Sequence, residues 1–224
     1  MDINQLDFLR SHSIKYLGVV LDEKLTFSKH ITSKCQIAAM NIQRIKTIRK
    51  YLTRESCTQL VQSFVISHLD YCGSLLYGLP SYNIKKLQRI QNWSAKLVLQ
   101  RGRLENSFQA LFDLKWLPMQ QRIHFRILTQ VYKCLIKEAP GYLKELIKIK
   151  EYNRPTRLSC SAGIKLVVPR TKCSTFASRA FSVAGPELWN GLPLNVRSAK
   201  TLNDFQRLLK RHLLSTIFSD FINS

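Results

Sequence analysis

The stretch that decides the fold is YNIKKLQRIQNWSAKLVLQ, which runs from Tyr82 to Gln100. When each residue advances by 100°, its basic residues and one tryptophan share a single face. This first basic face consists of Lys85, Lys86, Arg89, Trp93, Lys96 and, beyond Gly102, Arg103. The opposite face is apolar and carries Ile84, Leu87, Ile90, Ala95, Leu97 and Val98. So clean a separation predicts an amphipathic helix with its apolar side packed on neighbours.

Apolar residues recur at spacings of three and four on both sides of this stretch, so a mainly α fold is expected. Further helices are predicted over Ser28–Tyr51, Arg54–Tyr71, Glu105–Leu114, Pro118–Glu138, Tyr142–Ile149 and Thr201–Phe218. The last of these opens with a capping-box pattern, Thr201 followed by Asp204. Strand is expected only at Ser13–Leu21, as one strand without an obvious partner, and at Ile164–Val168.

The helix after Pro118 repeats the separation of charge from apolar residues. Its second basic face consists of Arg122, Arg126, Lys133 and Lys137. No Asp or Glu lies between Asp70 and Glu105 or between Asp113 and Glu138, whereas solvated helices usually offset their basic residues with nearby acids. The whole chain has 35 basic against 14 acidic residues, a net charge of +21.

Uncompensated basic faces favour a polyanion, because phosphates bind them with release of counterions. We therefore predict sequence-independent binding of RNA or RNA/DNA duplex, with Trp93 stacking on a base or sugar. The alternatives are that both faces are merely solvated, or that they meet acidic protein partners in a helical interaction module. Anionic membrane is a weaker alternative, since an interfacial helix would have to leave the core.

No catalytic residue, metal site, cofactor or small-molecule substrate is predicted. Asp22–Glu23 is the one adjacent acidic pair and is expected to form a solvated turn. The six cysteines show no zinc-ligand spacing, and we expect reduced thiols. His68, Cys72 and His124 are expected to line the core. Neither a secretion signal nor a transmembrane helix is recognised, so a nuclear or cytoplasmic location is expected.

Several short motifs follow one another in a familiar order. They are Tyr16-Leu17-Gly18-Val19, Leu69-Asp70-Tyr71-Cys72, Leu87 with Gln91-Asn92, Leu114-Lys115-Trp116-Leu117-Pro118 with Arg122-Ile123, Pro140-Gly141-Tyr142-Leu143, and Trp189-Asn190-Gly191-Leu192-Pro193. From Ser13 to about Phe218, this order resembles the region C-terminal to the polymerase active site in non-LTR retrotransposon (LINE) reverse transcriptases of the jockey-like and chicken-repeat-like groups. One departure is Lys115, where the family motif has histidine.

The resemblance implies a remnant of a palm strand at residues 1–23 and a thumb-like helical domain at 24–103. It implies a C-terminal helical region at 104–224, with a loop-rich segment at 151–175. The family's metal-binding aspartates would lie upstream of residue 1, so no polymerase activity is expected of this chain alone, and the missing palm is a further expected partner. The thumb's role of gripping template-primer agrees with the basic faces. A relic of a retrotransposon without selected function is the remaining alternative.

Overall fold

The computed structural model describes residues 13–150, 164–170 and 174–222. The predicted class is confirmed: the chain is mainly helical, with a two-stranded sheet near its N-terminus. It divides into two compact units. The first contains the chain up to Cys72 together with Leu79–Leu114, and the second contains Gly73–Gly78 and the chain from Lys115 onward.

The expected single strand at Ser13–Leu21 is wrong in detail, because the segment folds back on itself. Strands β1 (Ser13–Tyr16) and β2 (Val19–Asp22) form an antiparallel hairpin, with Tyr16 opposite Val19. Leu17 and Gly18 form the turn with φ of 44° and 77°, the positive values that a two-residue hairpin turn requires. The Tyr71 hydroxyl donates to the Leu17 carbonyl, which helps to hold a non-glycine residue in this conformation.

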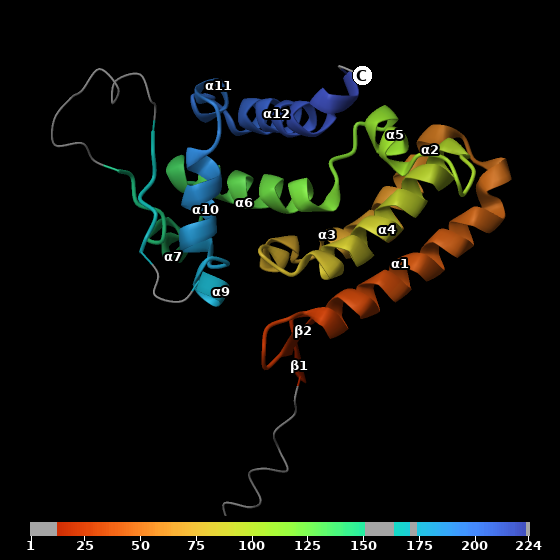
Figure 1. The fold of residues 1–224 in the computed structure, drawn as a ribbon, viewed down its shortest axis with the longest axis horizontal. Coiled ribbons are helices and arrows are strands. Elements are labelled where there is room, and N and C mark those ends of the chain that lie inside the picture. Colours follow the sequence, from red (N-terminus) through yellow and green to blue (C-terminus); the bar gives the residue numbers. More distant parts are fainter. Residues whose placement is uncertain (1–12, 151–163, 171–173, 223–224) are drawn as a thin grey trace, which may run out of the picture. The chain divides into compact units, whose positions relative to one another are not determined.

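Helices α1 and α4 form the centre of the first unit and lie side by side (Figure 1). The unit contains α1 (Ser28–Ile48), a 3-10 turn (Arg49–Tyr51), α2 (Arg54–Val61), a π-helical turn (Gln62–Ile66), α3 (Ser67–Asp70), α4 (Ser81–Leu99) and α5 (Ser107–Asp113). These bounds confirm the helices predicted from the sequence to within a few residues. The core includes Ile31, Ala38, Ile42, Cys57, Val61, Leu69, Leu87, Ala95 and Val98, which are at most 1% exposed.

Arg49 ties the end of α1 to the end of α4. Its side chain is 9% exposed. Nε donates to the Leu97 carbonyl at 3.0 Å and Nη2 to the Val98 carbonyl at 2.8 Å, while Nη1 donates to the Leu52 carbonyl at 2.7 Å. The last carbonyls of a helix lack intrahelical partners and carry partial negative charge. A buried guanidinium therefore satisfies this end of α4.

The second unit contains a 3-10 turn (Gly73–Leu76), α6 (Met119–Leu135), α7 (Gly141–Lys144), α9 (Ser174–Ala177), α10 (Phe181–Asn190), α11 (Leu194–Arg197) and α12 (Leu202–Ile222). Helix α6 packs against α10 and α12 (Figure 1). Three aromatic rings meet there: Phe205 stacks on Tyr132 at 4.3 Å and on Trp189 at 5.6 Å between ring centroids. Thr201 caps α12, since its hydroxyl oxygen accepts a hydrogen bond from the Asp204 backbone N–H at 3.1 Å.

No helix was predicted over α10, which contains Gly185 and Pro186, two residue types that ordinarily weaken or interrupt a helix. The structure shows why glycine is needed. A Cβ at Gly185 would lie 2.8 Å from Val131 Cγ2 of α6, so only glycine permits this close approach of the two helices.

The strand expected at Ile164–Val168 is not formed; this segment makes only an isolated antiparallel bridge, between Ile149 and Leu166. Asn190 holds it by its amide, which accepts from the Leu166 amide at 2.9 Å and donates to the Leu166 carbonyl at 2.8 Å. We call this contact the Asn190 clamp. Most of the predicted loop-rich segment, 151–163 and 171–173, lies outside the described residues. The helix expected over Tyr142–Ile149 is limited to α7.

Candidate nucleic-acid interface

The first basic face lies mainly along α4 in the first unit. Lys85 and Arg89 are exposed, whereas Lys86, Trp93 and Lys96 are half-buried. Lys86 lies 5.9 Å above the Tyr82 ring centroid. The prediction placed Arg103 on the face of this helix by continuing the helical spacing. Helix α4 ends at Leu99, so Arg103 is outside the helix. It lies in the turn that follows and is exposed.

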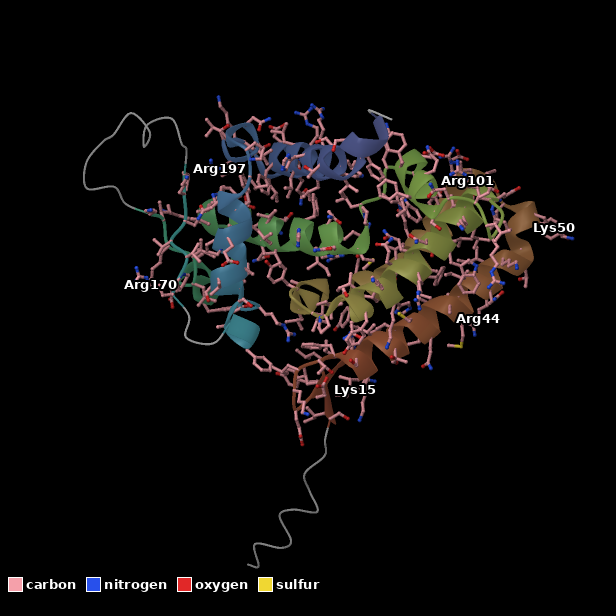
Figure 2. All side chains as sticks on the ribbon, in the orientation of Figure 1. Lys15, Arg44, Lys50, Arg101, Arg170 and Arg197 are labelled. Atoms are coloured by element: carbon pink, nitrogen blue, oxygen red, sulfur yellow. The ribbon has the colours of Figure 1, made fainter. Side chains whose placement is uncertain are left out.

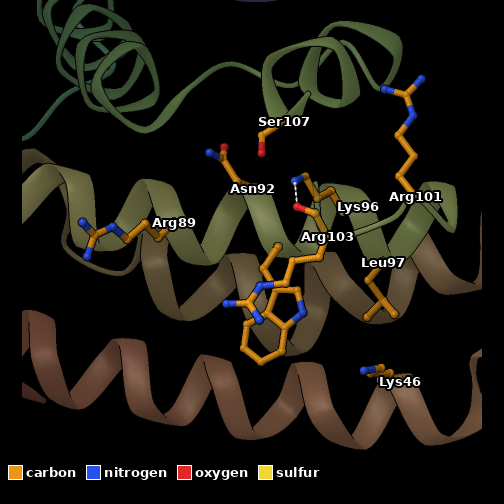
Figure 3. A pocket seen from close by; sticks show the side chains of 9 residues that line it. Lys46, Arg89, Asn92, Lys96, Leu97, Arg101, Arg103 and Ser107 are labelled. Carbon is orange, nitrogen blue, oxygen red and sulfur yellow. Dashed lines mark hydrogen bonds between the residues drawn. The ribbon is translucent and has the colours of Figure 1, made fainter. Parts of the chain in front are cut away.

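Four members of the first basic face meet at one pocket of about 750 Å³ in the first unit. It is lined by Lys46, Arg89, Asn92, Trp93, Lys96, Leu97, Arg101, Arg103 and Ser107. The lining comes from α1, from α4, from the turn after α4 and from the start of α5 (Figure 3). We call it the Trp93 pocket. None of these residues is acidic, so the pocket concentrates positive charge beside an indole ring.

Two of the five pocket cations have structural partners. The Lys96 ammonium donates to the Arg103 carbonyl at 2.7 Å (Figure 3), which fastens the turn to α4. Arg101 forms ion pairs with Glu105 and Asp113. Within the part of the chain that the structure describes, Lys46, Arg89 and Arg103 have no acidic partner. Their charge is available to an anion.

Sequence reasoning missed Lys46, Asn92, Arg101 and Ser107 as members of this site. Lys46 belongs to another helix, and which residues of α1 face α4 is decided by packing between helices. Asn92 and Ser107 carry no charge and gave no signal. Arg103 was included by continuing the helical spacing beyond the true end of α4, yet it does line the pocket.

The second basic face lies in the second unit. Arg126 and Lys137 are exposed, whereas Arg122 and Lys133 are half-buried on α6. Lys137 follows the helix in left-handed conformation, with φ of 65°. The aliphatic part of Arg126 passes close to Gly73, where an added Cβ would lie 3.6 Å from Arg126 Cδ.

The remaining titratable candidates lie in structural positions. Burial lowers the pKa of His124, whose ring lies 5.7 Å from that of Tyr77. Burial would raise the pKa of Asp22, but hydrogen bonds from the Thr26 and Phe27 amides outweigh it and leave the pKa lowered. Asp22 thus closes the turn before α1. Among the described residues there is no cluster of three or more metal-binding side chains, and none of their helices could span a membrane.

The residues that carry the family resemblance hold turns and cores. Tyr71 contacts the Leu17–Gly18 turn, which joins two of the motifs. Lys115 has φ of 52° and leads into Trp116, which is 7% exposed. Trp189 Nε1 donates to the Ile164 carbonyl at 3.0 Å, next to the Asn190 clamp. These motifs therefore define a fold more than a chemical site.

Comparison with known proteins gives one distant relative. The chain is 29% identical over 100 residues to the "Probable RNA-directed DNA polymerase from transposon X-element" of Drosophila melanogaster. The match covers 43% of this chain and 11% of that protein, so the chain spans a small part of its relative. No family model and no solved structure matches. The similarity supports a distant relationship to retrotransposon reverse transcriptases.

Proposed function

We propose that the chain is a C-terminal fragment of a LINE-type RNA-directed DNA polymerase that binds RNA or RNA/DNA template-primer without sequence preference. The distant similarity to a transposon polymerase and the order of the motifs support this origin. In this proposal the hairpin is the remnant of a palm, residues 24–103 form the thumb-like domain and residues 104–224 form the C-terminal region. The contribution of this chain is binding.

The observation that carries the proposal is the group of unpaired cations at the Trp93 pocket. Lys46, Arg89 and Arg103 come from three segments and have no acidic partner among the described residues. Like charges held together repel one another, and a phosphate backbone relieves that repulsion while releasing its own counterions. An ordinary solvated surface gives no reason to collect these charges around a tryptophan.

The test is the salt dependence of binding to a short RNA/DNA duplex, measured by fluorescence anisotropy. The variant carries Lys46→Glu and Arg89→Glu. Lys96 is left unchanged, because its bond to the Arg103 carbonyl would be lost. We expect weaker binding to every duplex sequence, and a slope of log affinity against log salt that is flatter by nearly one per lost phosphate contact.

The matched control carries Arg44→Glu and Lys50→Glu, which changes net charge equally. Both side chains are exposed at α1 and its end (Figure 2), outside the pocket. The control should affect affinity less than the pocket variant does. If the two variants lose affinity and salt slope equally, net charge alone explains binding and the proposed site is wrong. If a folded pocket variant binds as the parent does, this surface is merely solvated.

The second basic face is tested separately by Lys133→Glu with Lys137→Glu, which leaves Arg126 and its contact near Gly73 intact. A contribution to phosphate binding predicts a further fall in affinity and in salt slope. An unchanged slope in the folded variant would remove this face from the proposal.

A further inference from the structure

The Trp93 pocket has a property that gripping a duplex does not require. An open row of cations is sufficient to bind the phosphates of a duplex backbone. This site is instead a concave pocket with a volume of about 750 Å³. That volume lies in the range of pockets that hold one small ligand, roughly 300–1,000 Å³. The pocket therefore has room for a discrete chemical group.

The lining identifies the chemistry of that group. Trp93 and Leu97 supply apolar surface, and Lys46, Arg89 and Arg103 supply positive charge from different segments. Asn92 Oδ1 accepts from Gln88 Nε2 at 2.8 Å, so the amide NH2 of Asn92 remains as a donor at the pocket wall. A flat ring next to phosphate is the ligand that satisfies this set.

We infer that the Trp93 pocket binds an unpaired nucleotide of a single-stranded extension, with its base on the Trp93 indole and its neighbouring phosphates on Lys46, Arg89 and Arg103. The inference rests on the proposed function and specifies the nucleic acid that this site takes. Bases inside a duplex are covered on both faces by their neighbours, so an interior base must be splayed out or unpaired before it can stack on a side chain.

The turn after α4 gives the pocket a fixed wall. The Lys96 ammonium holds the Arg103 carbonyl at 2.7 Å. The ion pair of Arg101 with Glu105 closes the turn internally, and that with Asp113 attaches the turn to α5. Arg103 is thereby presented from a turn that is attached on two sides. A site organised before binding loses less conformational entropy when the ligand enters.

The experiment compares three probes on the complete chain: a blunt RNA/DNA duplex, the same duplex with a short unpaired extension, and that extended duplex with abasic sites in the extension. The last probe keeps the phosphates and removes the bases. We expect the intact extension to bind about 5- to 150-fold more tightly than the abasic one. Trp93→Leu should abolish this difference and leave the salt slope unchanged.

Tryptophan fluorescence gives a second readout that needs no variant. The other two tryptophans, Trp116 and Trp189, are only 7% and 1% exposed, so quenching by a stacked base should come from Trp93. The intact extension should quench and the abasic extension should not. The matched control for Trp93→Leu is Tyr51→Leu, because Tyr51 is an aromatic residue with 76% exposure outside the pocket. Tyr51→Leu should preserve the tighter binding of the intact extension over the abasic one.

The outcomes separate this inference from the proposed function. Equal affinity and equal quenching for the intact and abasic extensions would overturn the unpaired-nucleotide site, while salt-dependent binding of all three probes would leave the proposed function standing. Failure to bind any probe would remove both. If Trp93→Leu lowers the thermal midpoint, the quenching comparison on the parent chain decides the matter.

Discussion

Replacing Arg49 by methionine should destabilise the first unit more than the loss of any exposed cation. Methionine keeps an unbranched chain and removes all three hydrogen bonds that Arg49 donates to carbonyl oxygens. The Leu97 carbonyl keeps a partner in the Gln100 amide at 3.3 Å. The Val98 and Leu52 carbonyls lose the guanidinium.

The magnitude follows from those two bonds. A hydrogen bond from a charged group contributes about 1.5–3 kcal/mol, and both donors belong to a side chain that is 9% exposed. The two bonds together contribute about 3–6 kcal/mol, and rehydration of the freed carbonyls at the end of α4 offsets part of this, so we expect the free energy of unfolding to fall by about 2–5 kcal/mol. Arg49→Lys should recover less than half of this, since an ammonium cannot present the planar fork that reaches three carbonyls.

The assay is urea unfolding followed by circular dichroism, combined with amide hydrogen exchange at the last turn of α4. The two units need not unfold together, so a fall in overall stability does not by itself show which unit is destabilised. Faster amide hydrogen exchange at the last turn of α4 would assign the loss of stability to the first unit. The control is Arg44→Met on the exposed side of α1 (Figure 2), which should change stability by no more than about 0.5 kcal/mol. A loss below about 1 kcal/mol for Arg49→Met would show that the hydrogen bonds of Arg49 do not hold the end of α1 to the end of α4.

Four further outcomes are expected. Burial and the charge of Lys34 lower the pKa of His30. As pH falls, His30 is therefore protonated in the unfolded chain before it is protonated in the folded chain, and stability should fall as pH drops below about 6.5. His30→Gln should weaken this pH dependence in acid titrations followed by circular dichroism. Burial raises the pKa of Cys35 to about 11, so mass spectrometry should find Cys35 unmodified by iodoacetamide at pH 8 until the chain unfolds; rapid native modification would contradict this. Thr201→Ala should cost about 1 kcal/mol through the lost cap of α12, measured by urea unfolding against Thr201→Ser, and no loss would exclude a capping role. Asn190→Leu should release the Leu166 amide, seen as faster exchange there, whereas unchanged protection would show that the Asn190 clamp is dispensable.

The long amphipathic helices could be predicted because their signal is local. The repeat of Ile31, Ala38, Ile42 and Ile45 is sufficient to place α1 without knowledge of its neighbours. The hairpin could not be predicted in the same way. Leu17–Gly18 lacks the Asn-Gly or Asp-Gly signature of such turns, and the Tyr71 hydroxyl that contacts it lies far along the chain.

The candidate site likewise contains residues that a local pattern predicts and residues that only the packing of helices brings together. Arg89, Trp93 and Lys96 share a face of one helix, so periodicity finds them. Lys46 joins them only because α1 packs on α4, and no spacing within either helix encodes that contact. Helix α10 was missed because the close approach that requires Gly185 is visible only once α6 is in place.

The Asn190 clamp has a consequence for how this chain can change over time. With the bridge between Ile149 and Leu166, it fastens both flanks of residues 151–163 to the same unit. These contacts are made by the described residues alone. Changes of sequence between the two flanks therefore leave Ile149, Leu166 and Asn190 with the same partners, and the helices around Phe205 keep their packing.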